Sequence, residues 1–360
     1  MNVAFFGSGR CFHTFDWFRS CSDLLGKPVP FITDNYEGDG LPCLFREGDD
    51  ARELIIIDRL LSTEATAVGH KWRNLIKFLV IPIQIFLLRR HLAKLNQPFL
   101  LAHSTYYAFV ASFTRAPYAA IPQGSEVLVR PKSRFYRWLL QRSVRKARFI
   151  TVDSEAMRKV LVGMTDRPVF IVQNGINIRA VQEPKSDVRD RIMSIRAISS
   201  NYRIAEIFAG RDAALPDASL TLTFPFTEGV YYEAVSTLVQ ERDAMLGCID
   251  KTDLYGLMAS AICVVSIPES DSSPRSVYEA IFAGAAALCA PAQYIEALPE
   301  CMRARVIVVD VTQADWLGKG VALAKEIVKN PYIPSEAALV AFDQRKSMAR
   351  CLQLIEEVQP

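Results

Sequence analysis

The sequence predicts an α/β protein with two doubly wound domains, and three observations lead to this prediction. Short runs of apolar, β-branched residues alternate with stretches of helical period along the chain, which is typical of parallel sheets covered by helices. The chain has 360 residues, enough for two domains that each bury a core. A polar and charged stretch, Arg179–Arg191, has no apolar period and is interpreted as the linker between them.

Each predicted strand is a short apolar run. In the first half of the chain these runs are Val3–Phe6, Leu54–Ile57, Phe99–Ala102, Tyr118–Ile121, Phe149–Val152 and Val169–Val172. In the second half they are Ile192–Ile195, Leu220–Phe224, Ala261–Ser266, Ala286–Ala290 and Val306–Val309. Helices of the second half are expected at Glu228–Glu241, Asp253–Ala259, Pro274–Ala283, Asp315–Lys329 and Ser335–Val358.

The composition is that of an ordinary globular protein, with 50% hydrophobic and 22% charged residues. Eight cysteines, at positions 11, 21, 43, 248, 263, 289, 301 and 351, form no Cys-x-x-Cys pair and lack the spacing of a metal site. We expect reduced thiols, with Cys263 and Cys289 inside buried strands. Met1 leads directly into the first predicted strand, so no signal peptide is expected.

The net charge is only +3, but the charges are unevenly distributed along the chain. Between Glu64 and Asp153 there are fifteen Lys and Arg and a single acidic residue, Glu126. Such a basic region indicates an anionic partner for the first domain. The sequence contains no recognisable nucleic-acid-binding module, so a membrane surface is favoured over nucleic acid.

One segment of this basic region, Trp72–Lys94, has an apolar centre followed by Arg89, Arg90 and Lys94. Its longest uncharged run, Phe78–Leu88, is too short to span a bilayer, which takes roughly 20 residues. The segment could lie on the anionic cytoplasmic face of a membrane, or it could be a packed helix with a solvated basic end. A second amphipathic candidate on the same terms combines Phe135, Trp138 and Leu139 with Arg134, Arg137 and Arg142.

The segment Val264–Pro291 carries the clearest chemical pattern of the chain. An apolar strand is followed by a loop of small polar residues, a proline, a helix, an Ala/Gly-rich turn and another strand. Asp271 precedes the helix, and Glu279 stands eight residues later, inside it. The helix N-terminus exposes backbone N–H groups and favours an anion such as phosphate. Because the Glu279 carboxylate is suited to the vicinal hydroxyls of a ribose, the segment predicts a sugar-nucleotide site.

This segment resembles the donor-binding motif of GT-B-fold glycosyltransferases, specifically the large retaining group called family four. That motif has two acids separated by seven residues, followed by alanine, a few small residues and glycine. Here it consists of Asp271, Glu279, Ala280, Ala283 and Gly284. The usual first acid is Glu, so this chain departs from the family at Asp271, whose side chain is one methylene shorter.

Three other segments resemble the same family in the same order, so the resemblance covers most of the chain. They are the Gly-Ser-acid loop at Gln123–Val127, the Asn-Gly hinge at Gln173–Asn177 and the stretch before the motif, Gly247–Pro268. The resemblance implies the GT-B fold, in which two Rossmann-like domains face a cleft. Residues 1–180 would form the acceptor-binding domain and residues 181–340 the donor-binding domain. Residues 341–360 would form a helix that crosses back to the first domain.

The resemblance also implies roles for single residues. Glu279 would bind the ribose hydroxyls, and Asp271 would contact the donor sugar or stabilise charge near its anomeric carbon. Otherwise they are a helix-surface glutamate and a capping aspartate. Arg196 occupies the place of an Arg that binds the donor diphosphate together with a Lys five residues later. Here that later position is Asn201, and the nearest cation is Arg203. The remaining donor-binding candidates lie at the helix start, at Ser273, Pro274, Arg275 and Ser276.

In the first domain, the family often has a His just before the glycine of the matched loop. This chain has Gln123 at that position, followed by Gly124 and Ser125, and all three are candidates for the acceptor side of the cleft. His103, after the strand Phe99–Ala102, is therefore the better candidate for a catalytic side chain in the cleft, although such a His is equally often structural.

The turn after the first strand consists of Gly7, Ser8 and Gly9. It lacks the third glycine of a dinucleotide-binding fingerprint, because Phe12 stands there. The turn is a candidate place for an acceptor or a donor phosphate to approach the backbone.

The resemblance implies a retaining glycosyltransferase that moves a hexose from a nucleotide-diphosphate sugar to a lipid-linked glycan acceptor. The reaction would belong to the assembly of a bacterial surface polysaccharide such as lipopolysaccharide or capsule. No Asp-x-Asp motif is present, and neither a metal nor a cofactor is expected. The protein is expected in the cytoplasm, peripheral on the inner face of the membrane. A catalytically degenerate partner subunit, a nucleotide-sugar epimerase and a phosphorylase of the same architecture remain as alternatives.

Overall fold

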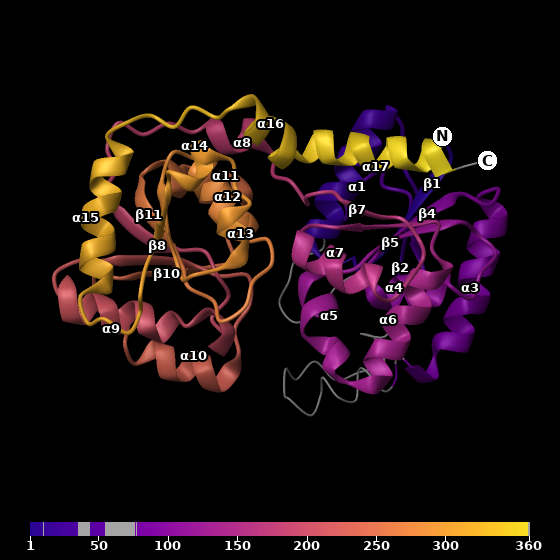
Figure 1. Cartoon of the computed structure of the whole chain (residues 1–360), viewed down its shortest axis with the longest axis horizontal. Coiled ribbons are helices and arrows are strands. Elements are labelled where there is room, and N and C mark those ends of the chain that lie inside the picture. The colour runs from indigo at the N-terminus through magenta and orange to yellow at the C-terminus, as the bar shows by residue number, and fades with distance from the viewer. Residues whose placement is uncertain (10, 35–43, 55–75, 77, 359–360) are drawn as a thin grey trace. The chain divides into compact units, whose positions relative to one another are not determined.

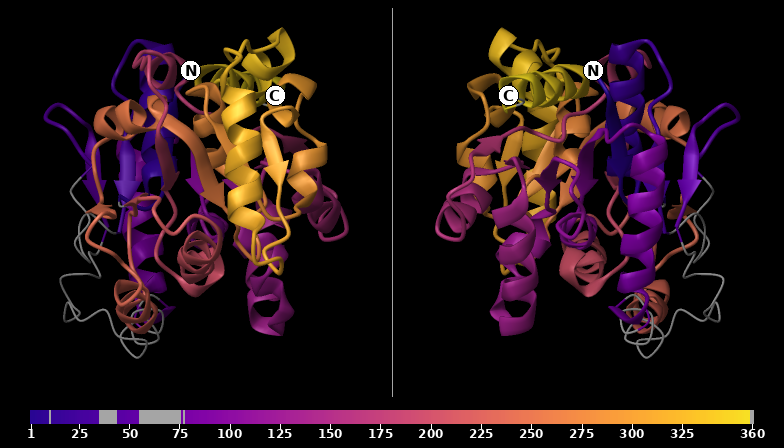
Figure 2. Two further views of the ribbon diagram at one scale, coloured as in Figure 1. Left: turned by 90° about the vertical axis from the view of Figure 1, so that its left-hand side faces the viewer. Right: turned by 90° about the vertical axis from the view of Figure 1, so that its right-hand side faces the viewer.

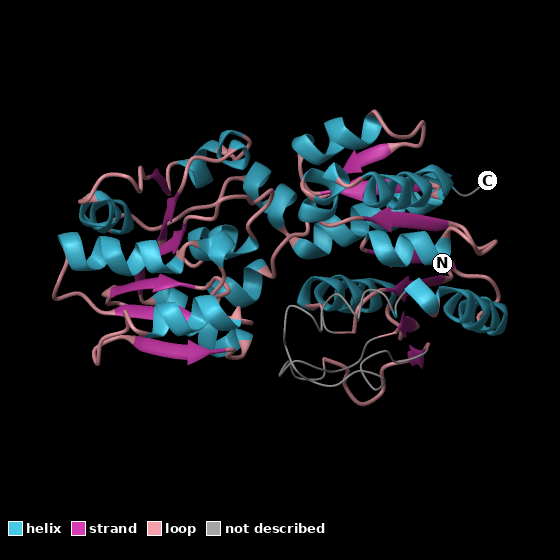
Figure 3. Ribbon diagram, turned by 90° about the horizontal axis from the view of Figure 1, so that it is seen from below, coloured by secondary structure: helices cyan, strands magenta, loops and turns pink. Residues whose placement is uncertain are grey.

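The computed structural model describes residues 1–9, 11–34, 44–54, 76 and 78–358 (Figure 1). Contacts within the chain divide it into two units. The N-terminal unit comprises Met1–Asn174 and Gln344–Pro360, and the C-terminal unit comprises Gly175–Asp343. The predicted boundary was at residue 180, six residues further along the chain. Each unit is built on one parallel sheet with helices on both faces, so the predicted α/β class is confirmed (Figure 2 and Figure 3).

The sheet of the N-terminal unit has the order β3-β2-β1-β4-β5-β6-β7. Its strands are β1 (Val3–Phe6), β2 (Phe31–Thr33), β3 (Ala51–Glu53), β4 (Phe99–His103), β5 (Tyr118–Ile121), β6 (Phe149–Val152) and β7 (Val169–Ile171). Its helices are α1 (Phe12–Leu25), α3 (Ile81–Lys94), α4 (Thr105–Ala111), α5 (Gly124–Leu128), α6 (Arg134–Lys146), α7 (Glu155–Val162) and α17 (Gln344–Val358), with a 3₁₀ turn η2 (Arg130–Lys132). The strand order reverses between β1 and β4, which is where open α/β sheets bind ligands.

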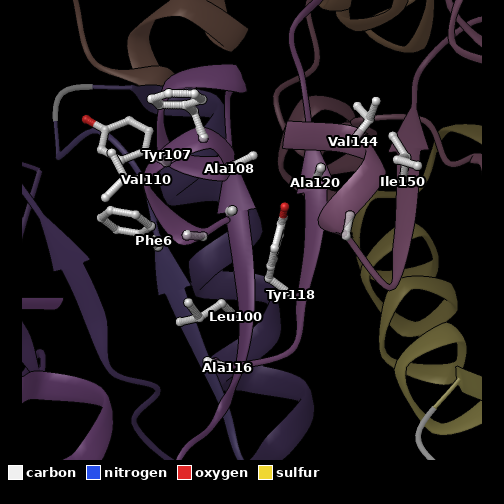
Figure 4. Packing of buried hydrophobic residues seen from close by; sticks show 14 of the residues in the cluster. Phe6, Leu100, Tyr107, Ala108, Val110, Ala116, Tyr118, Ala120, Val144 and Ile150 are labelled. Carbon is white, nitrogen blue, oxygen red and sulfur yellow. The ribbon is translucent and has the colours of Figure 1, made fainter. Parts of the chain in front are cut away.

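This sheet has a core on each face, because successive strand residues point to opposite sides. On one face Phe6, Leu100 and Tyr118 pack among buried residues of α3, α4 and α6 (Figure 4). On the other face Phe5 packs with α1 and with α17, which contributes Met348 among others. The strands therefore read as continuous apolar runs, which is why most of them could be predicted.

The C-terminal helix belongs to the N-terminal unit, as the resemblance implied. α17 packs along α1, and the Gln344 side chain donates hydrogen bonds to the Asp16 backbone oxygen and, at 2.9 Å, to Ser20 Oγ. The prediction of one helix over Ser335–Val358 is wrong. The chain forms α16 (Glu336–Phe342), then an extended residue, Asp343 (φ −73°, ψ 117°), and then α17.

The sheet of the C-terminal unit has the order β10-β9-β8-β11-β12-β13. Its strands are β8 (Arg191–Ser194), β9 (Leu220–Thr223), β10 (Ala244–Gly247), β11 (Ala261–Ser266), β12 (Ala286–Cys289) and β13 (Val306–Val308). Its helices are α8 (Ile178–Gln182), α9 (Ile204–Ala214), α10 (Gly229–Ser236), α11 (Lys251–Ala259), α12 (Arg275–Phe282), α13 (Gln293–Glu296), α14 (Glu300–Arg303), α15 (Trp316–Val328) and α16, with a 3₁₀ turn η3 (Ser200–Tyr202). Here the order reverses between β8 and β11.

Several predicted boundaries need correction. β3 at Ala51–Glu53 was not predicted, and of the strand expected at Leu54–Ile57 only Leu54, which follows β3, belongs to the described part of the chain. The predicted linker Arg179–Arg191 begins within α8 and ends at the first residue of β8. β2 and β10 were not predicted, because β2 has only three residues and the residues of β10 are half-buried or exposed.

Candidate functional site

The segment with the two acids follows the strand on one side of the switch point in the C-terminal unit. β11 is buried along its whole length, and its chain continues through a polar loop into α12. Pro274 is extended and directly precedes the first helical residue. Because proline has no N–H, it fixes the start of α12 at this position. All eight residues of α12 are buried, and the helix N-terminus is held beside the ends of β8 and β11.

Arg196 joins the end of β8 to this segment. Its Nη2 donates to Asp271 Oδ2, its Nη1 donates to Ser276 Oγ at 2.7 Å, and its guanidinium lies 4.3 Å from the centroid of the Tyr202 ring. The side chains of Arg196 and Asp271 are only 11% and 16% exposed. Arg196, predicted from another part of the sequence, thus contacts two residues of the predicted donor motif, and Tyr202 was not predicted.

The Asp271 carboxylate is oriented through both of its oxygens. Oδ2 accepts from Arg196, and Oδ1 accepts from the backbone N–H of Ser273 at 3.2 Å. The Ser273 hydroxyl is in turn 3.2 Å from the Tyr278 hydroxyl. The acid is therefore part of a fixed loop structure on this side of α12.

Glu279 is buried in the second turn of α12. Tyr255 of α11 donates its hydroxyl to Glu279 Oε1 at 3.1 Å, and Arg275 Nη2 lies 3.9 Å from the same oxygen. Glu279 and Arg275 are 8% and 7% exposed, so neither is a helix-surface residue. Tyr255 was missed by the sequence reasoning, although it lies in the stretch Gly247–Pro268 that resembles the family.

Arg203, predicted to bind the donor diphosphate, contacts the loop after β11. It has a positive φ of 50°, and its Nε donates to the Ile267 oxygen at 2.6 Å. Asn201, which stands at the family's Lys position, accepts at its backbone oxygen from the Glu269 N–H at 2.8 Å. The segment around η3 therefore braces the loop after β11.

A cavity of about 170 Å³ lies beside Asp271. It is lined by two loops, residues 268–271 after β11 and residues 290–294 after β12. This volume is below the roughly 300–1,000 Å³ of pockets that enclose drug-sized ligands. The cavity could therefore hold at most a small group such as a single sugar ring.

The end of β12 places a neutral pair near these charges. Cys289 and Tyr294 are buried and hydrogen-bonded to each other. Burial raises the pKa of the Cys289 thiol to about 12 and raises the pKa of Tyr294 above its ordinary range. Cys289 therefore remains a thiol at neutral pH, as expected for a core cysteine.

The switch point of the N-terminal unit holds the predicted turn and His103. Gly7 follows β1, and a Cβ on it would lie 2.7 Å from Thr14 Cγ2, so only glycine fits there without movement of its neighbours. Gly9 donates its N–H to Thr33 Oγ1 at 3.0 Å. The Ser8 hydroxyl hydrogen-bonds Tyr107. The turn is thus fixed against β2 and α4.

His103, at the end of β4, is buried. Its Nδ1 is 2.8 Å from Thr14 Oγ1, and Gln123 Nε2 lies 3.2 Å and 3.3 Å from its two ring nitrogens. Burial lowers the pKa of His103 to about 4, so the imidazole is neutral at pH 7. The structure thus brings the two predicted residues His103 and Gln123 into contact, with Thr14 as a partner that the sequence did not indicate.

Glu126, the single acid of the basic region, fixes the start of α5. Its Oε2 accepts from the backbone N–H of Thr105 at 2.8 Å, from the Thr105 hydroxyl at 2.9 Å and from the N–H of Gln123 at 2.9 Å. Gly124 and Ser125 form the first turn of α5, and Ser125 is exposed. Glu126 therefore positions the predicted loop but is itself buried.

A second buried acid was missed by the sequence reasoning. Asp34, after β2, accepts at Oδ1 from the Tyr107 hydroxyl at 2.7 Å and at Oδ2 from Gln84 Nε2 at 3.1 Å. Tyr106 donates its hydroxyl to Gln84 Oε1. Burial raises the pKa of both tyrosines, so their hydroxyls stay protonated donors. Through Gln84 this network ties α3 to the sheet.

Two features are absent from the part of the chain that the structure describes. No group of three or more His, Cys, Asp or Glu is placed so that it could hold a metal ion. None of the helices in this part of the chain is both long and apolar enough to cross a membrane.

Comparisons with known proteins show the fold. No protein-family model and no curated protein sequence matches this chain. Among solved structures, sucrose-phosphate synthase from Thermosynechococcus elongatus is similar with a TM-score of 0.75 at 13% identity, covering 99% of each chain. The Anabaena HepE protein in complex with UDP and glucose is similar with a TM-score of 0.71 at 12% identity, again covering 99% of each chain.

A third similar structure is WaaG, a glycosyltransferase involved in lipopolysaccharide biosynthesis. It gives a TM-score of 0.66 at 14% identity and covers 98% of this chain and 99% of its own. Together with the two parallel sheets, these similarities confirm the predicted GT-B fold.

Proposed function

We propose that this GT-B-fold chain is a metal-independent, retaining glycosyltransferase that takes a hexose from a nucleotide-diphosphate sugar. The observation that carries the proposal is the cluster of Arg196, Asp271 and Ser276 at the switch point of the C-terminal unit, with Glu279 in the same helix. This arrangement combines a buried cation, a helix N-terminus and two carboxylates within one unit. The similar HepE structure binds UDP and glucose, which supports a nucleotide-sugar donor.

The chemistry requires stabilisation of a departing diphosphate. In our proposal the Arg196 guanidinium exchanges its contact with Asp271 for phosphate oxygens, while the N–H groups at the start of α12 bind the same anion. Such fixed donors need no reorganisation when negative charge develops on the leaving group. Asp271, released from Arg196, would then lie near the anomeric carbon. No cofactor takes part.

Glu279 would bind the ribose hydroxyls. Its carboxylate is already oriented by Tyr255 and Arg275. The side chain therefore loses little conformational entropy when the ribose binds. Hydrogen bonds to a charged acceptor are worth roughly 1.5–3 kcal/mol. Tyr255 and Arg275 therefore contribute to donor binding by fixing Glu279, and Arg275 stays a candidate for direct contact with the donor.

The N-terminal unit would bind the acceptor through the turn Gly7–Gly9 and the start of α5, where Gln123 contacts His103. We propose that the acceptor is a lipid-linked glycan. The transfer would take place at the cytoplasmic face of the membrane, during assembly of a surface polysaccharide. The similarity to WaaG, a glycosyltransferase of lipopolysaccharide biosynthesis, and the basic region of the chain support this assignment.

The experiment that tests the proposal is a transfer assay with the purified protein. Radiolabelled nucleotide sugars are incubated with a cellular lipid extract in the presence of EDTA, and label in the lipid fraction is counted. We expect transfer from one nucleotide sugar, and a loss of about ten- to a hundredfold at subsaturating donor in Glu279→Ala. The exposed Glu300→Ala serves as the control and should transfer normally. Equal activity of Glu279→Ala and the wild type would contradict the assigned role.

A further inference from the structure

Exposed apolar side chains follow one face of the helical segment that contains α3. Leu79, Ile83 and Phe86 are 68%, 50% and 65% exposed. Their spacing of four and then three residues puts them on a single side of a helix. Large apolar residues exposed at consecutive turns are unusual on a monomer surface and mark an interaction site when they are contiguous.

The surface continues onto α6. Phe135 and Trp138 are 54% and 51% exposed and stand three residues apart on that helix. The ring centroids of Phe78 and Phe135 are 5.2 Å apart, and those of Phe135 and Trp138 are 6.0 Å apart. These ring contacts join α6 to the residues just before α3, and we call Leu79, Ile83, Phe86, Phe135 and Trp138 the apolar face.

The apolar face is additional to the packing of both helices, because each already has a buried side. Ile81, Gln84, Leu88 and Leu92 of α3 are buried, and Gln84 is bonded to the buried Asp34. On α6 the buried residues are Leu139, Leu140, Ser143 and Val144. Leu139, expected on the amphipathic surface, is therefore a core residue. Trp138 also packs against the buried ring of Phe109, with centroids 5.5 Å apart, whereas Leu79, Ile83 and Phe86 lie outside the core cluster on this face of the sheet.

The charges on these elements have one sign. The exposed cations of α3, α6 and the turn before α6 are Arg89, Arg90, Lys94, Arg130, Lys132, Arg134, Arg137, Arg145 and Lys146. The single acid between Glu64 and Asp153 in the sequence is Glu126, which is buried and accepts hydrogen bonds from Thr105 and Gln123. A surface of this kind complements an anionic partner over its whole extent.

We propose that the apolar face docks onto an anionic lipid bilayer, with α3 and α6 lying in the headgroup region and their aromatic and aliphatic side chains reaching the acyl boundary. Trp and Phe prefer this interfacial depth, and Leu79 and Ile83 gain from leaving water. The neighbouring Arg and Lys bind the anionic headgroups. α3 has 14 residues, too few to span the bilayer, so it lies on the surface.

Nucleic acid fits this surface less well, because phosphates would use the cations but leave Leu79, Ile83 and Phe86 in water. The inference rests on the proposed function only in placing the chain at a membrane. Membrane binding is measured without sugar transfer, so membrane docking can be disproved while the transferase activity is confirmed. Equally, the activity can be disproved while membrane docking is confirmed.

The test is co-sedimentation with vesicles of phosphatidylglycerol and phosphatidylcholine, compared with vesicles of phosphatidylcholine alone. We expect binding to the mixed vesicles, weakened by rising salt because screening reduces the headgroup attraction. The double variant Phe86→Ser, Trp138→Ser should bind at least tenfold more weakly, since each ring then loses its apolar burial. Leu323→Ser, at a 56% exposed position of α15, is the matched control and should bind normally.

Two further readouts separate docking from misfolding and from self-association. The double variant should keep its nucleotide binding and melting temperature, and the wild type should sediment as the same species at low and high protein concentration. Trp138 fluorescence, obtained as the difference between the wild type and Trp138→Phe, should shift to the blue on adding the mixed vesicles. Equal binding to both vesicle types, unchanged binding of the double variant, or a self-association that the double variant abolishes would overturn the proposal.

Discussion

At the scale of the residue, Arg196 connects the end of β8, the loop after β11 and the first turn of α12. Its guanidinium contacts Asp271, Ser276 and the Tyr202 ring, and its side chain is only 11% exposed. A planar guanidinium can grip two phosphate oxygens at once, which a Lys cannot. The residue is thus prepared for an anion in the position that the Asp271 carboxylate occupies in this structure.

Arg196→Ala should weaken binding of the donor nucleotide about ten- to a hundredfold, because a charge-assisted hydrogen bond is lost. Arg196→Lys should recover only part of this affinity. Arg191→Ala removes an exposed Arg from β8 and should leave the affinity unchanged. Isothermal titration of the three variants with the preferred nucleotide measures the effect. An affinity that is the same in Arg196→Ala and Arg191→Ala would exclude Arg196 from the site.

His103 makes the stability of the protein depend on pH. The pKa of its imidazole is lowered to about 4 in the folded protein, against about 6.5 when unfolded. Between these values the unfolded chain binds the proton first, so acid favours unfolding. The free energy of unfolding should fall by on the order of 3 kcal/mol as the pH drops from 6.5 to 4 because of this group.

Urea unfolding of the wild type and His103→Gln at pH 7 and pH 4.5 checks this prediction. The variant should lose less stability between the two pH values, whatever its stability at pH 7. Equal losses in the two proteins would show that His103 is not held neutral by burial.

At the scale of the element, the long-range contacts decide what the sequence could predict. β5, β6 and β11 were predicted with the correct ends, because each is a fully buried apolar run. The break between α16 and α17 was missed, because Asp343 is neither Pro nor Gly and gives no local signal.

The same limit applies to the site. The spacing of Asp271 and Glu279 was visible in the sequence, and so was the place of Arg196 after a strand. The partners Tyr255 and Glu126 were not, because each acts on a residue far away or in another element. The role of Arg203 at the diphosphate stays a prediction from its position, and the hydrogen bond from its Nε to the Ile267 oxygen gave no signal in the sequence.

α9 is joined to its neighbours through a buried ion pair that also depends on distant residues. Arg211 Nη1 is 2.8 Å from Asp243 Oδ2, both side chains are fully buried, and Asp243 also accepts from the N–H groups of Leu220 and Gln240. Asp243→Ala would leave the buried guanidinium without its buried counter-ion and should destabilise the C-terminal unit by about 3–5 kcal/mol.

Asp212→Ala is the matched control, because Asp212 also contacts Arg211 but is 46% exposed. Its melting temperature should change little, whereas that of Asp243→Ala should fall by many degrees. Similar melting temperatures for the two variants would mean that the buried pair contributes no more than the exposed one.

At the scale of the whole molecule, the two units differ in charge and in the chemistry at their switch points. The basic region between Glu64 and Asp153 lies in the N-terminal half, together with the apolar face and a neutral His103. The C-terminal unit holds Arg196, Asp271 and Glu279. In our proposal the N-terminal unit therefore docks on the membrane and binds the acceptor, and the C-terminal unit binds the nucleotide without a metal.

The most direct test of the account is a binding titration of the purified protein with UDP, GDP, CMP, dTDP and NAD in EDTA, followed as the melting temperature. One nucleoside diphosphate should raise the melting temperature by several degrees, since saturation at about 100 times Kd adds about 2.7 kcal/mol. Glu279→Ala and Arg196→Ala should both abolish that rise. No rise with any nucleotide, a rise with NAD alone, or a rise that both variants preserve would contradict the account.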